Sequence, residues 1–437
     1  MRKQRSRHLA PSVQAGRKSS HHGLAFVSAV CVLAIALVCV FAYGWTSAGF
    51  GSWLRHGTGA AGDAQSVSPG PQSHSGTSKT LVRSATPAPD MSEAAKAHRA
   101  VAAMSLEERI GQLVMVPLFA GADPASLQSV ITDRYAGSVL IIGNWTGGTA
   151  QVRAAVDQLQ SYAPAGNRLL VTTDQEGGLV QHLTGAGFDA MPSATVQGAM
   201  SVDQLRTSAT TWGSQLAQAG VNVDLAPVVG TVTTDRWSNA PIGALNRDFG
   251  LDASGNADHA IAFVEGMRQA GVQSAIKHYP GLGAVTGNTD FTADGILDTT
   301  TVLNGPETGA FDRVIGESDP AMVMMALATY QAIDPNNPAV FSPTIIDGHI
   351  RGDLGYEGVI TSDSLSAAAV SGYDITQLGV KLIEAGGDLA CIGQVDYIAP
   401  ILDGLNARAT ADPAFAAKAT RAAERVMTLK YRMGLAR

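Results

Sequence analysis

The feature that most constrains this chain is a regular alternation of short apolar runs with longer amphipathic segments across residues 93–437. The eight apolar runs are residues 113–119, 138–143, 168–174, 221–229, 274–279, 321–328, 358–363 and 388–393. The helix-like segments include residues 149–162, 203–219, 255–270, 366–385 and 412–433. Strands buried on both faces of a parallel sheet have this continuous apolar character. The alternation therefore predicts an α/β fold, a (β/α)8 TIM-type barrel.

A doubly wound open sheet is the alternative arrangement of alternating strands and helices. Its dinucleotide-binding form carries a G-x-G-x-x-G turn after the first strand, and no such turn follows residues 113–119. We therefore expect the strands to close into a barrel.

Residues 1–92 differ in composition from the predicted barrel. Residues 1–23 are basic, residues 24–45 are almost entirely apolar, and residues 46–92 are rich in Gly, Ser, Pro and Thr. About 20 apolar residues are enough for a helix to cross a bilayer, and flanking basic residues stay in the cytoplasm. We expect a basic cytoplasmic segment, a single transmembrane anchor at the cell membrane, and a flexible tether that holds residues 93–437 outside the cytoplasm. A cleaved signal peptide, which would make the protein secreted, is the alternative.

Composition argues against some classes of partner. The formal net charge of −7 argues against a nucleic-acid-binding protein, which would carry a basic surface. Of the three cysteines, Cys31 and Cys39 fall in the apolar N-terminal run, which leaves Cys391 without an internal disulfide partner. No C-x-x-C or H-E-x-x-H spacing occurs, so we expect no metal site.

Polar residues follow several of the predicted strands. The side chains concerned are Asp174, Arg247, Lys277, His278 and Asp363. Because the carboxyl ends of barrel strands meet at one rim, we expect these side chains to share one pocket. Each residue alone has a simpler interpretation, such as a helix cap for Asp363 or a polar pair of Lys277 with His278. Carboxylates with Lys and Arg suit a sugar ligand, whose hydroxyls they bind and whose anomeric carbon a carboxylate can attack.

Four sequence blocks resemble the signature motifs of glycoside hydrolase family 3. They are DQEGGLVQHL at residues 174–183, IGALNRDFG at 242–250, KHYPGLG at 277–283 and ITSDSL at 360–365. The similarity is to the branch of single-domain β-N-acetylglucosaminidases, or β-N-acetylhexosaminidases, whose last helix also resembles RVMTLKYRMGL at 425–435. The blocks occur in family order over about residues 105–437. The resemblance implies the N-terminal-type barrel of that family at residues 93–437, as a monomer without metal or organic cofactor.

Residue by residue, the resemblance implies catalytic and binding roles. Asp363 matches the nucleophile, which forms a covalent glycosyl-enzyme intermediate in a reaction that retains the anomeric configuration. Asp174 matches the carboxylate that binds sugar hydroxyls in the −1 subsite. Arg247, Lys277 and His278 match sugar-binding positions around it, and we count His182 with the substrate-binding residues.

The loop after residues 274–279 departs from the family pattern. In the branch, an Asp-Ser-His sequence supplies the general acid/base histidine, and this chain has Asn288, Thr289 and Asp290 instead. Asp290 would serve as the acid/base if burial raised its pKa toward working pH. Alternatively, the site binds sugar without cleaving it, or His182 or another loop residue has taken the role.

Other departures affect the rim of the predicted pocket. Leu282 replaces the histidine of the family's PGHG turn, and Leu179 and His182 stand where arginines are usual. We expect an exported, membrane-anchored glycosidase that acts on β-linked N-acetylglucosamine or related hexosides of cell-wall or other glycans. Asp363 is its predicted nucleophile, and Asp290 is its candidate acid/base. The alternative is a catalytically impaired relative that binds glycan without hydrolysing it.

Overall fold

Eight parallel strands form the centre of the protein in a computed structural model that describes residues 92–437. Their order in the sheet is β12-β9-β7-β6-β3-β2-β1-β13. The strands are β1 (Val114–Phe119), β2 (Ser138–Ile142), β3 (Leu170–Thr173), β6 (Val223–Asp224), β7 (Gln273–Tyr279), β9 (Met322–Met325), β12 (Val359–Ser362) and β13 (Ala390–Cys391). A parallel bridge between Thr361 and Leu389 joins β12 to β13 and closes the ring. The predicted α/β barrel is thereby confirmed.

Most residues of the barrel strands are apolar because both faces of the sheet are covered. Successive side chains of a strand point to opposite faces. In β1, Met115 belongs to the hydrophobic cluster inside the barrel, whereas Val114 and Val116 belong to the cluster between the strands and the helices. Leu140 of β2 and Met322 of β9 extend the inner cluster.

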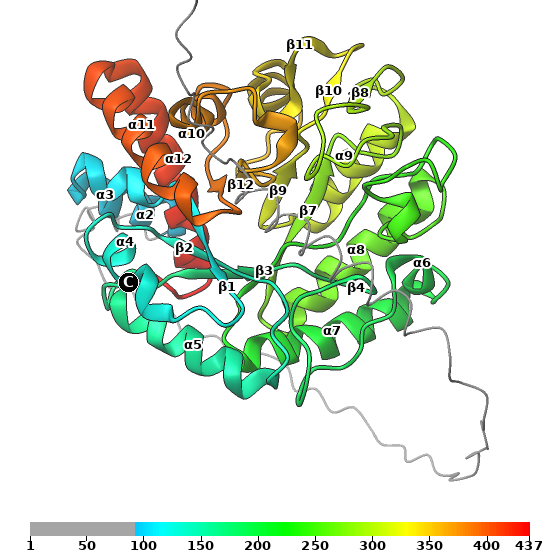
Figure 1. Ribbon diagram of the computed structural model, residues 1–437, viewed down its shortest axis with the longest axis horizontal. Helices are drawn as coiled ribbons and strands as arrows, with labels where there is room; N and C mark the ends of the chain where they lie inside the picture. The colour runs from blue at the N-terminus through cyan, green and yellow to red at the C-terminus, as the bar shows by residue number, and fades with distance from the viewer. Residues whose placement is uncertain (1–91) are drawn as a thin grey trace, which may run out of the picture. The chain divides into compact units, whose positions relative to one another are not determined.

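Helices cover the outside of the barrel, and in Figure 1 α5, α7, α8 and α9 follow one another around the strands. The helices are α2 (Glu93–Ala103), α3 (Leu106–Gly111), α4 (Gln128–Thr132), α5 (Gly148–Tyr162), α6 (Ala194–Gln197), α7 (Val202–Gln218), α8 (Ala253–Gln269), α9 (Pro306–Ser318), α10 (Ile375–Glu384), α11 (Ile398–Ala411) and α12 (Pro413–Arg432). A π-helix, η4 (Thr344–Asp353), precedes β12. Local sequence sets several helix starts: Ser201 and Gln204 form a capping box at α7, and Asp412 caps α12 ahead of Pro413.

Helix α10 begins later than the predicted segment 366–385, at Ile375. Asp374 caps its first turn by accepting a hydrogen bond from the Thr376 amide. The preceding residues include only a short 3-10 turn, η5 (Ala368–Val370). Because no helix starts directly after β12, Asp363 does not act as a helix cap.

Helix α12 closes the end of the barrel at which the strands begin. Its Val426 and Leu429 side chains belong to the hydrophobic cluster inside the barrel. The chain that follows α12 pairs with the segment before β3 through a bridge between Asn167 and Ala436. Only the opposite end, where the strands finish, is left for the polar residues.

Two small sheets lie in connections that follow barrel strands. Strands β4 (Gln175–Gly177) and β5 (Val180–Gln181) form an antiparallel hairpin directly after β3. Strands β8 (Leu297–Asp298), β10 (Thr329–Tyr330) and β11 (Asp334–Pro338) form the second sheet.

The predicted basic segment (1–23) and anchor (24–45), and the tether (46–92) up to residue 91, lie outside the described residues. Among residues 92–437, no helix is both long enough and apolar enough to cross a membrane.

Candidate active site

Asp174, Glu176, Arg247 and Lys277 form a buried ionic cluster near the carboxyl ends of β3 and β7. Lys277 Nζ lies 2.5 Å from Asp174 Oδ1 and 2.6 Å from Glu176 Oε1. Arg247 donates two hydrogen bonds to the Glu176 carboxylate, from Nε at 2.9 Å and from Nη2 at 2.8 Å. The Lys277 and Glu176 side chains are only 1% and 3% exposed. Buried charges of this kind are tolerated because each has an opposite partner.

The β4–β5 hairpin places two carboxylates on the cluster. Asp174 and Glu176 are two residues apart, the spacing that puts side chains on one face of an extended chain. The hairpin turns at Gly177 and Gly178, both with positive φ, and a Cβ on Gly177 would lie 2.3 Å from the Pro192 carbonyl oxygen. Glycine is therefore required at this turn, and the turn fixes the direction of the Glu176 side chain.

Arg247 reaches the cluster from the connection between β6 and α8. Its backbone amide donates to the Ile242 carbonyl, and its Nη1 donates to the Pro241 carbonyl at 2.8 Å. Asn246, the preceding residue, adopts a left-handed conformation at φ +53 that ends a short 3-10 turn. These contacts hold the guanidinium against Glu176 without help from a ligand.

Burial and pairing have opposite effects on the charges of the cluster. Burial alone would lower the pKa of Lys277, but the Asp174 and Glu176 carboxylates raise it above its usual value. Burial alone would raise the pKa of Glu176, but Arg247 and Lys277 hold it well below its usual range. Lys277 and Glu176 are therefore both charged at neutral pH.

Asp363 follows β12 and is largely buried beside this cluster. Its Oδ1 accepts a hydrogen bond of 2.7 Å from the Ser364 amide, and its own amide donates to the Met325 carbonyl on β9. Burial, and next the negative charge of Asp290, raise the pKa of Asp363 to about 7.

His278 lies next to Asp363, with Nε2 3.8 Å from Asp363 Oδ2. Burial, and then the positive charges of Arg247 and Lys277, lower the pKa of His278 well below its usual value, so the ring is neutral at pH 7. Its Nδ1 is buried and has no hydrogen-bond partner within residues 92–437. An unpaired buried nitrogen costs about 1–3 kcal/mol, a cost that a hydroxyl of a bound ligand would remove.

Asp290 is brought to Asp363 by backbone hydrogen bonds between two loops. The carbonyls of Thr289 and Asp290 accept from the amides of Ala369 and Ala368, at 3.0 and 3.2 Å. The loop that follows β7 is thereby attached to the segment that follows Asp363. This tertiary pairing also explains why residues 366–374 do not continue α10.

The Asp290 side chain is exposed, whereas that of Asp363 is only 16% exposed. Partial loss of hydration raises the pKa of Asp290, and the opposing effects of Arg247 and Lys277 lower it by less. Because Asp290 raises the pKa of Asp363, the two carboxyls titrate as an interacting pair.

His182 lies beside Asp174 of the ionic cluster. Its Nε2 is 4.0 Å from Asp174 Oδ2, and its side chain is 24% exposed. The structure thus places His182 next to Asp174, the proposed sugar-binding carboxylate.

Two buried carboxylates were missed by the sequence analysis. Glu176 bridges Arg247 and Lys277, and its i+2 spacing from Asp174 was the signal that would have identified it. Asp224 ends β6, accepts a hydrogen bond from the Gln175 amide at 3.0 Å, and leaves its Oδ2 without a partner in the described chain. Burial raises the pKa of Asp224 well above its usual value.

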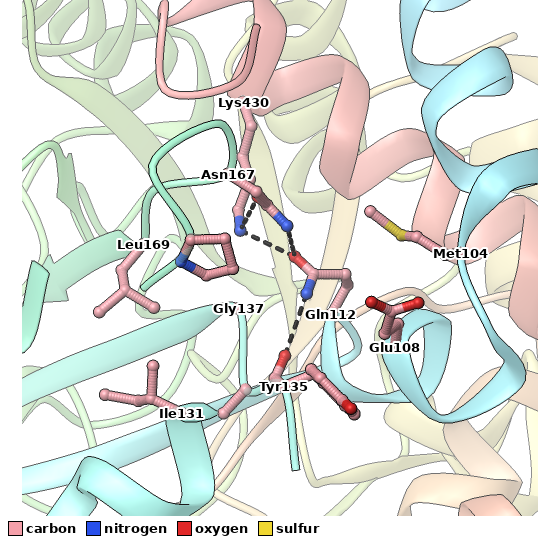
Figure 2. A pocket seen from close by; sticks show the side chains of 11 residues that line it. Met104, Glu108, Gln112, Ile131, Tyr135, Gly137, Asn167, Leu169 and Lys430 are labelled. Atoms are coloured by element: carbon pink, nitrogen blue, oxygen red, sulfur yellow. Dashed lines mark hydrogen bonds between the residues drawn. The ribbon is translucent and has the colours of Figure 1, made fainter. Parts of the chain in front are cut away.

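A separate small pocket lies at the opposite end of the barrel, around Lys430 of α12 (Figure 2). Lys430 Nζ donates to Gln112 Oε1 at 2.8 Å and to Asn167 Oδ1 at 2.9 Å. The cavity has a volume of about 40 Å³, whereas small-molecule sites usually have roughly 300 Å³ or more. We therefore assign this pocket a structural role.

The site around Asp363 has the groups that hydrolysis of a glycosidic bond requires. It combines a buried carboxyl, a second carboxyl coupled to it, and fixed cations and carboxylates that can bind hydroxyls. Within residues 92–437, no group of three or more His, Cys, Asp or Glu side chains is arranged to hold a metal ion.

Comparison with known proteins places this geometry in a family. The sequence model of the glycosyl hydrolase family 3 N-terminal domain matches residues 105–429. The β-hexosaminidase LpqI of Mycobacterium tuberculosis is 28% identical over 339 residues, which cover 75% of this chain and 84% of the relative. A β-hexosaminidase of Alkalilimnicola ehrlichii is 31% identical over 292 residues, or 64% of this chain and 81% of the relative.

Solved structures agree with the sequence comparison. The β-N-acetylhexosaminidase of Beutenbergia cavernae is 41% identical, with a TM-score of 0.72 over 76% of this chain and 99% of that one. A family 3 β-N-acetylglucosaminidase of Paenibacillus is 28% identical, with a TM-score of 0.68 over 76% of this chain and 63% of that one. The chain therefore belongs to glycosyl hydrolase family 3 and is a glycosidase.

Proposed function

We propose that this protein hydrolyses the β-glycosidic bond of N-acetylglucosamine or a related N-acetylhexosamine, with retention of configuration. The observation that carries the proposal is the Asp363–Asp290 pair, in which a buried carboxyl is electrostatically coupled to a second one at the mouth of the pocket. The names of the relatives, β-hexosaminidases and β-N-acetylhexosaminidases, support the choice of sugar.

Asp363 is the proposed nucleophile and Asp290 the proposed acid/base. In the first step a carboxylate oxygen of Asp363 bonds to the anomeric carbon, the bond from that carbon to the glycosidic oxygen breaks, and Asp290 gives its proton to that oxygen. In the second step Asp290 takes a proton from water, the water oxygen bonds to the anomeric carbon, and the ester bond to Asp363 breaks. Two inversions at one carbon give net retention.

The ionic cluster is the proposed binding site for the hydroxyls of the reacting sugar. Within residues 92–437, the nearest charged partner of Asp174 Oδ2 is His182 Nε2, at 4.0 Å. Lys277 Nζ contacts the Asp174 and Glu176 carboxylates, which leaves its third N–H for a ligand. Because Arg247 and Lys277 are held by protein groups before any sugar arrives, little ordering is needed on binding.

The pH dependence follows from the coupled carboxyls. The reaction needs one proton on the pair, on Asp290, while Asp363 is ionised. Burial and the neighbouring Asp290 charge raise the pKa of Asp363 to about 7, so the pair loses its last proton near that pH. We expect kcat/KM to decline as pH rises through about 7. A profile that stays flat from pH 6 to about 9 would contradict this assignment of the shared proton.

Replacement of Asp290 by Asn tests the acid/base role with two leaving groups. A dinitrophenyl group departs without a proton, so kcat/KM for its glycoside, which reports the first step, should stay close to that of the wild type, whereas kcat falls because the second step lacks its base. A methyl or sugar leaving group needs the proton, and its kcat should fall by about 10²–10⁴-fold. Added azide should restore turnover and yield a β-glycosyl azide.

Asp294→Asn is the matched control, because Asp294 is an exposed aspartate in the same loop. This variant should keep wild-type rates with both leaving groups. Equal losses with both leaving groups in Asp290→Asn would exclude Asp290 as the acid/base, and His182→Asn would then be the variant to test.

Asp363→Asn tests the nucleophile. We expect loss of turnover with every leaving group, and a slow fluorinated N-acetylhexosaminide should leave a sugar ester on the Asp363 peptide of the wild type, detected by mass spectrometry. Binding of N-acetylglucosamine oligomers without turnover by the wild type would instead support a glycan-binding protein that does not hydrolyse.

Location outside the cytoplasm belongs to the same proposal. The apolar composition of residues 24–45 after a basic start supports a membrane anchor or a secretion signal. Cell-wall or other external glycans would then be the accessible substrates. Protection of the barrel from external protease in intact cells would contradict the proposed location.

A further inference from the structure

The exposed apolar side chains of the barrel are concentrated on the side of the molecule that carries Asp363. Residues 92–437 expose eight large apolar side chains. Seven of them lie at the end of a barrel strand or in the connection that leads from a strand to the next helix, and Val196 lies in the short helix α6. The most exposed are Phe291, Trp237 and Leu179, at 76%, 74% and 69%. Large apolar side chains gathered on one side of a soluble domain indicate a binding surface.

These three residues lie on the segments that also carry the charged residues of the pocket. Leu179 is in the turn of the β4–β5 hairpin, three residues after Glu176, and Phe291 directly follows Asp290. Trp237 is in the connection between β6 and α8, which also carries Arg247. The three side chains therefore lie on loops at the end of the barrel that carries Asp363.

The segment that carries Trp237 is fixed in place. The side-chain Nδ2 of Asn239 donates to the backbone carbonyls of Leu282 and Val285, at 2.8 and 2.7 Å. These bonds link the segment of Trp237 to the loop that carries Asp290. Arg236, the residue before Trp237, pairs with the buried Asp248 at 2.7 Å. Trp237 and Phe291 are thus held on connected loops with their rings exposed. Exposure of an aromatic ring to water is unfavourable compared with its burial.

The charges at the mouth restrict what these apolar side chains can contact. The cations of the pocket, Arg247 and Lys277, are buried and bound to carboxylates. Asp290 is exposed beside Phe291, and it is negative when ionised. An anionic group next to the reacting sugar would therefore find apolar surface and like charge without a free cation.

We infer that Trp237, Phe291 and Leu179 form the subsite for the leaving group and that this subsite takes an uncharged sugar ring. The apolar face of a pyranose packs on aromatic and aliphatic side chains, and its hydroxyls stay in water. The substrate class is thus a neutral oligosaccharide of β-linked N-acetylhexosamine, in preference to one whose second sugar carries a carboxylate. This inference rests on the proposed function, because it names the sugar on the other side of the cleaved bond.

The test compares two substrates that differ only in the leaving group. One is the β-linked disaccharide of N-acetylglucosamine, and the other is methyl β-N-acetylglucosaminide, which does not reach the subsite. In Trp237→Ala with Phe291→Ala, kcat/KM for the disaccharide should fall about tenfold relative to that for the methyl glycoside, the scale of one or two aromatic contacts. Val302→Ala, which truncates an exposed valine before α9, should leave the ratio unchanged.

A second comparison tests the charge preference. The wild type should cleave the neutral disaccharide faster than its analogue with N-acetylmuramic acid as the second sugar, and Leu179→Arg should reduce that preference. An unchanged substrate ratio in the double variant, or a wild-type preference for the acidic disaccharide, would overturn the inference.

Failure of the proposed function gives a different result. In that case the wild type would cleave neither the methyl glycoside nor the disaccharide. Calorimetric titration of Asp363→Asn with the disaccharide then decides the inference by itself. Weaker binding when Trp237 and Phe291 are also truncated supports the subsite, and equal binding refutes it.

Discussion

The two ends of the barrel each bury a lysine, and the two lysines are held in different charge states. Lys277, at the end where the strands finish, touches the carboxylates of Asp174 and Glu176, which raise its pKa against the effect of burial. Lys430, at the end closed by α12, touches only the amide oxygens of Gln112 and Asn167. Burial lowers the pKa of Lys430 to about 7. Burial is the same for both, so the partners decide the charge.

The difference separates a binding site from a structural contact. A charged lysine in a low-dielectric pocket can hold a sugar hydroxyl strongly, and the protein must supply two carboxylates to keep it charged. A lysine that only links α12 to the start of the barrel needs no counter-charge, because its neutral amine can donate to two amide oxygens.

The largest effect is expected for Lys277→Met. Removal of the cation leaves Asp174 without its partner and Glu176 with Arg247 alone. Loss of one partner from a buried ionic group typically costs about 3–5 kcal/mol, and we expect a decrease of that order in the free energy of unfolding, measured by urea denaturation. Hydrolysis should be lost as well, because the sugar-binding cluster is no longer neutralised.

Lys418→Met is the control for that measurement. Lys418 lies on α12 and is about one-third exposed; its Nζ donates to the Glu384 carbonyl at 2.5 Å and lies 3.5 Å from Asp347 Oδ2. Its replacement should change stability by less than about 1 kcal/mol, as for other surface ion pairs. A similar small change in Lys277→Met would show that the cluster at the rim does not depend on its cation.

Lys430→Met should produce a smaller effect that depends on pH. Above pH 7 the folded amine is neutral, whereas the unfolded lysine keeps its proton up to its ordinary value of 10.5. In this window the unfolded state binds one more proton, so the stability of the wild type rises with pH by about 1.4 kcal/mol per unit from this group. The variant lacks the group, so the wild type should gain about 2–3 kcal/mol on it between pH 7 and about 9.

Urea denaturation of both proteins at several pH values measures this difference in the free energy of unfolding. Lys418→Met provides the reference for a partly exposed lysine of the same helix. A constant difference between wild type and Lys430→Met would mean that Lys430 is charged in the folded protein. The contrast between the two lysines would then be wrong.

The strands of the barrel could be predicted from sequence, because burial on both faces leaves a continuous apolar run for each of them. The start of α10 could not. Residues 366–374 resemble a helix locally, but the amides of Ala368 and Ala369 bind the loop that follows β7. That pairing depends on two segments about 80 residues apart and leaves no periodic signal in either.

The candidate site shows the same limit. The residues that the motifs singled out lie together at the rim, since strand ends meet in a barrel. Glu176 was missed because its partners are distant in sequence: Lys277 comes from β7 and Arg247 from the connection between β6 and α8. The charge state of Lys430 depends in the same way on Gln112 and Asn167, which are far away in sequence. Tertiary partners of buried polar groups are the part of the structure that one sequence does not reveal.

The smallest effect is expected for Glu176→Gln, which removes one charge from the rim and keeps the shape of the side chain. Arg247 and Lys277 would lose a charge-assisted hydrogen bond, worth about 1.5–3 kcal/mol, and would hold the sugar less firmly before and during the reaction. We expect KM to rise about ten- to hundredfold with kcat nearly unchanged, the pattern for lost uniform binding. Glu108→Gln makes the same change beside the Lys430 pocket and should leave both constants unaltered. A fall in kcat at constant KM in Glu176→Gln, or equal changes in the two variants, would show that the carboxylate at the rim does not serve to position the cations.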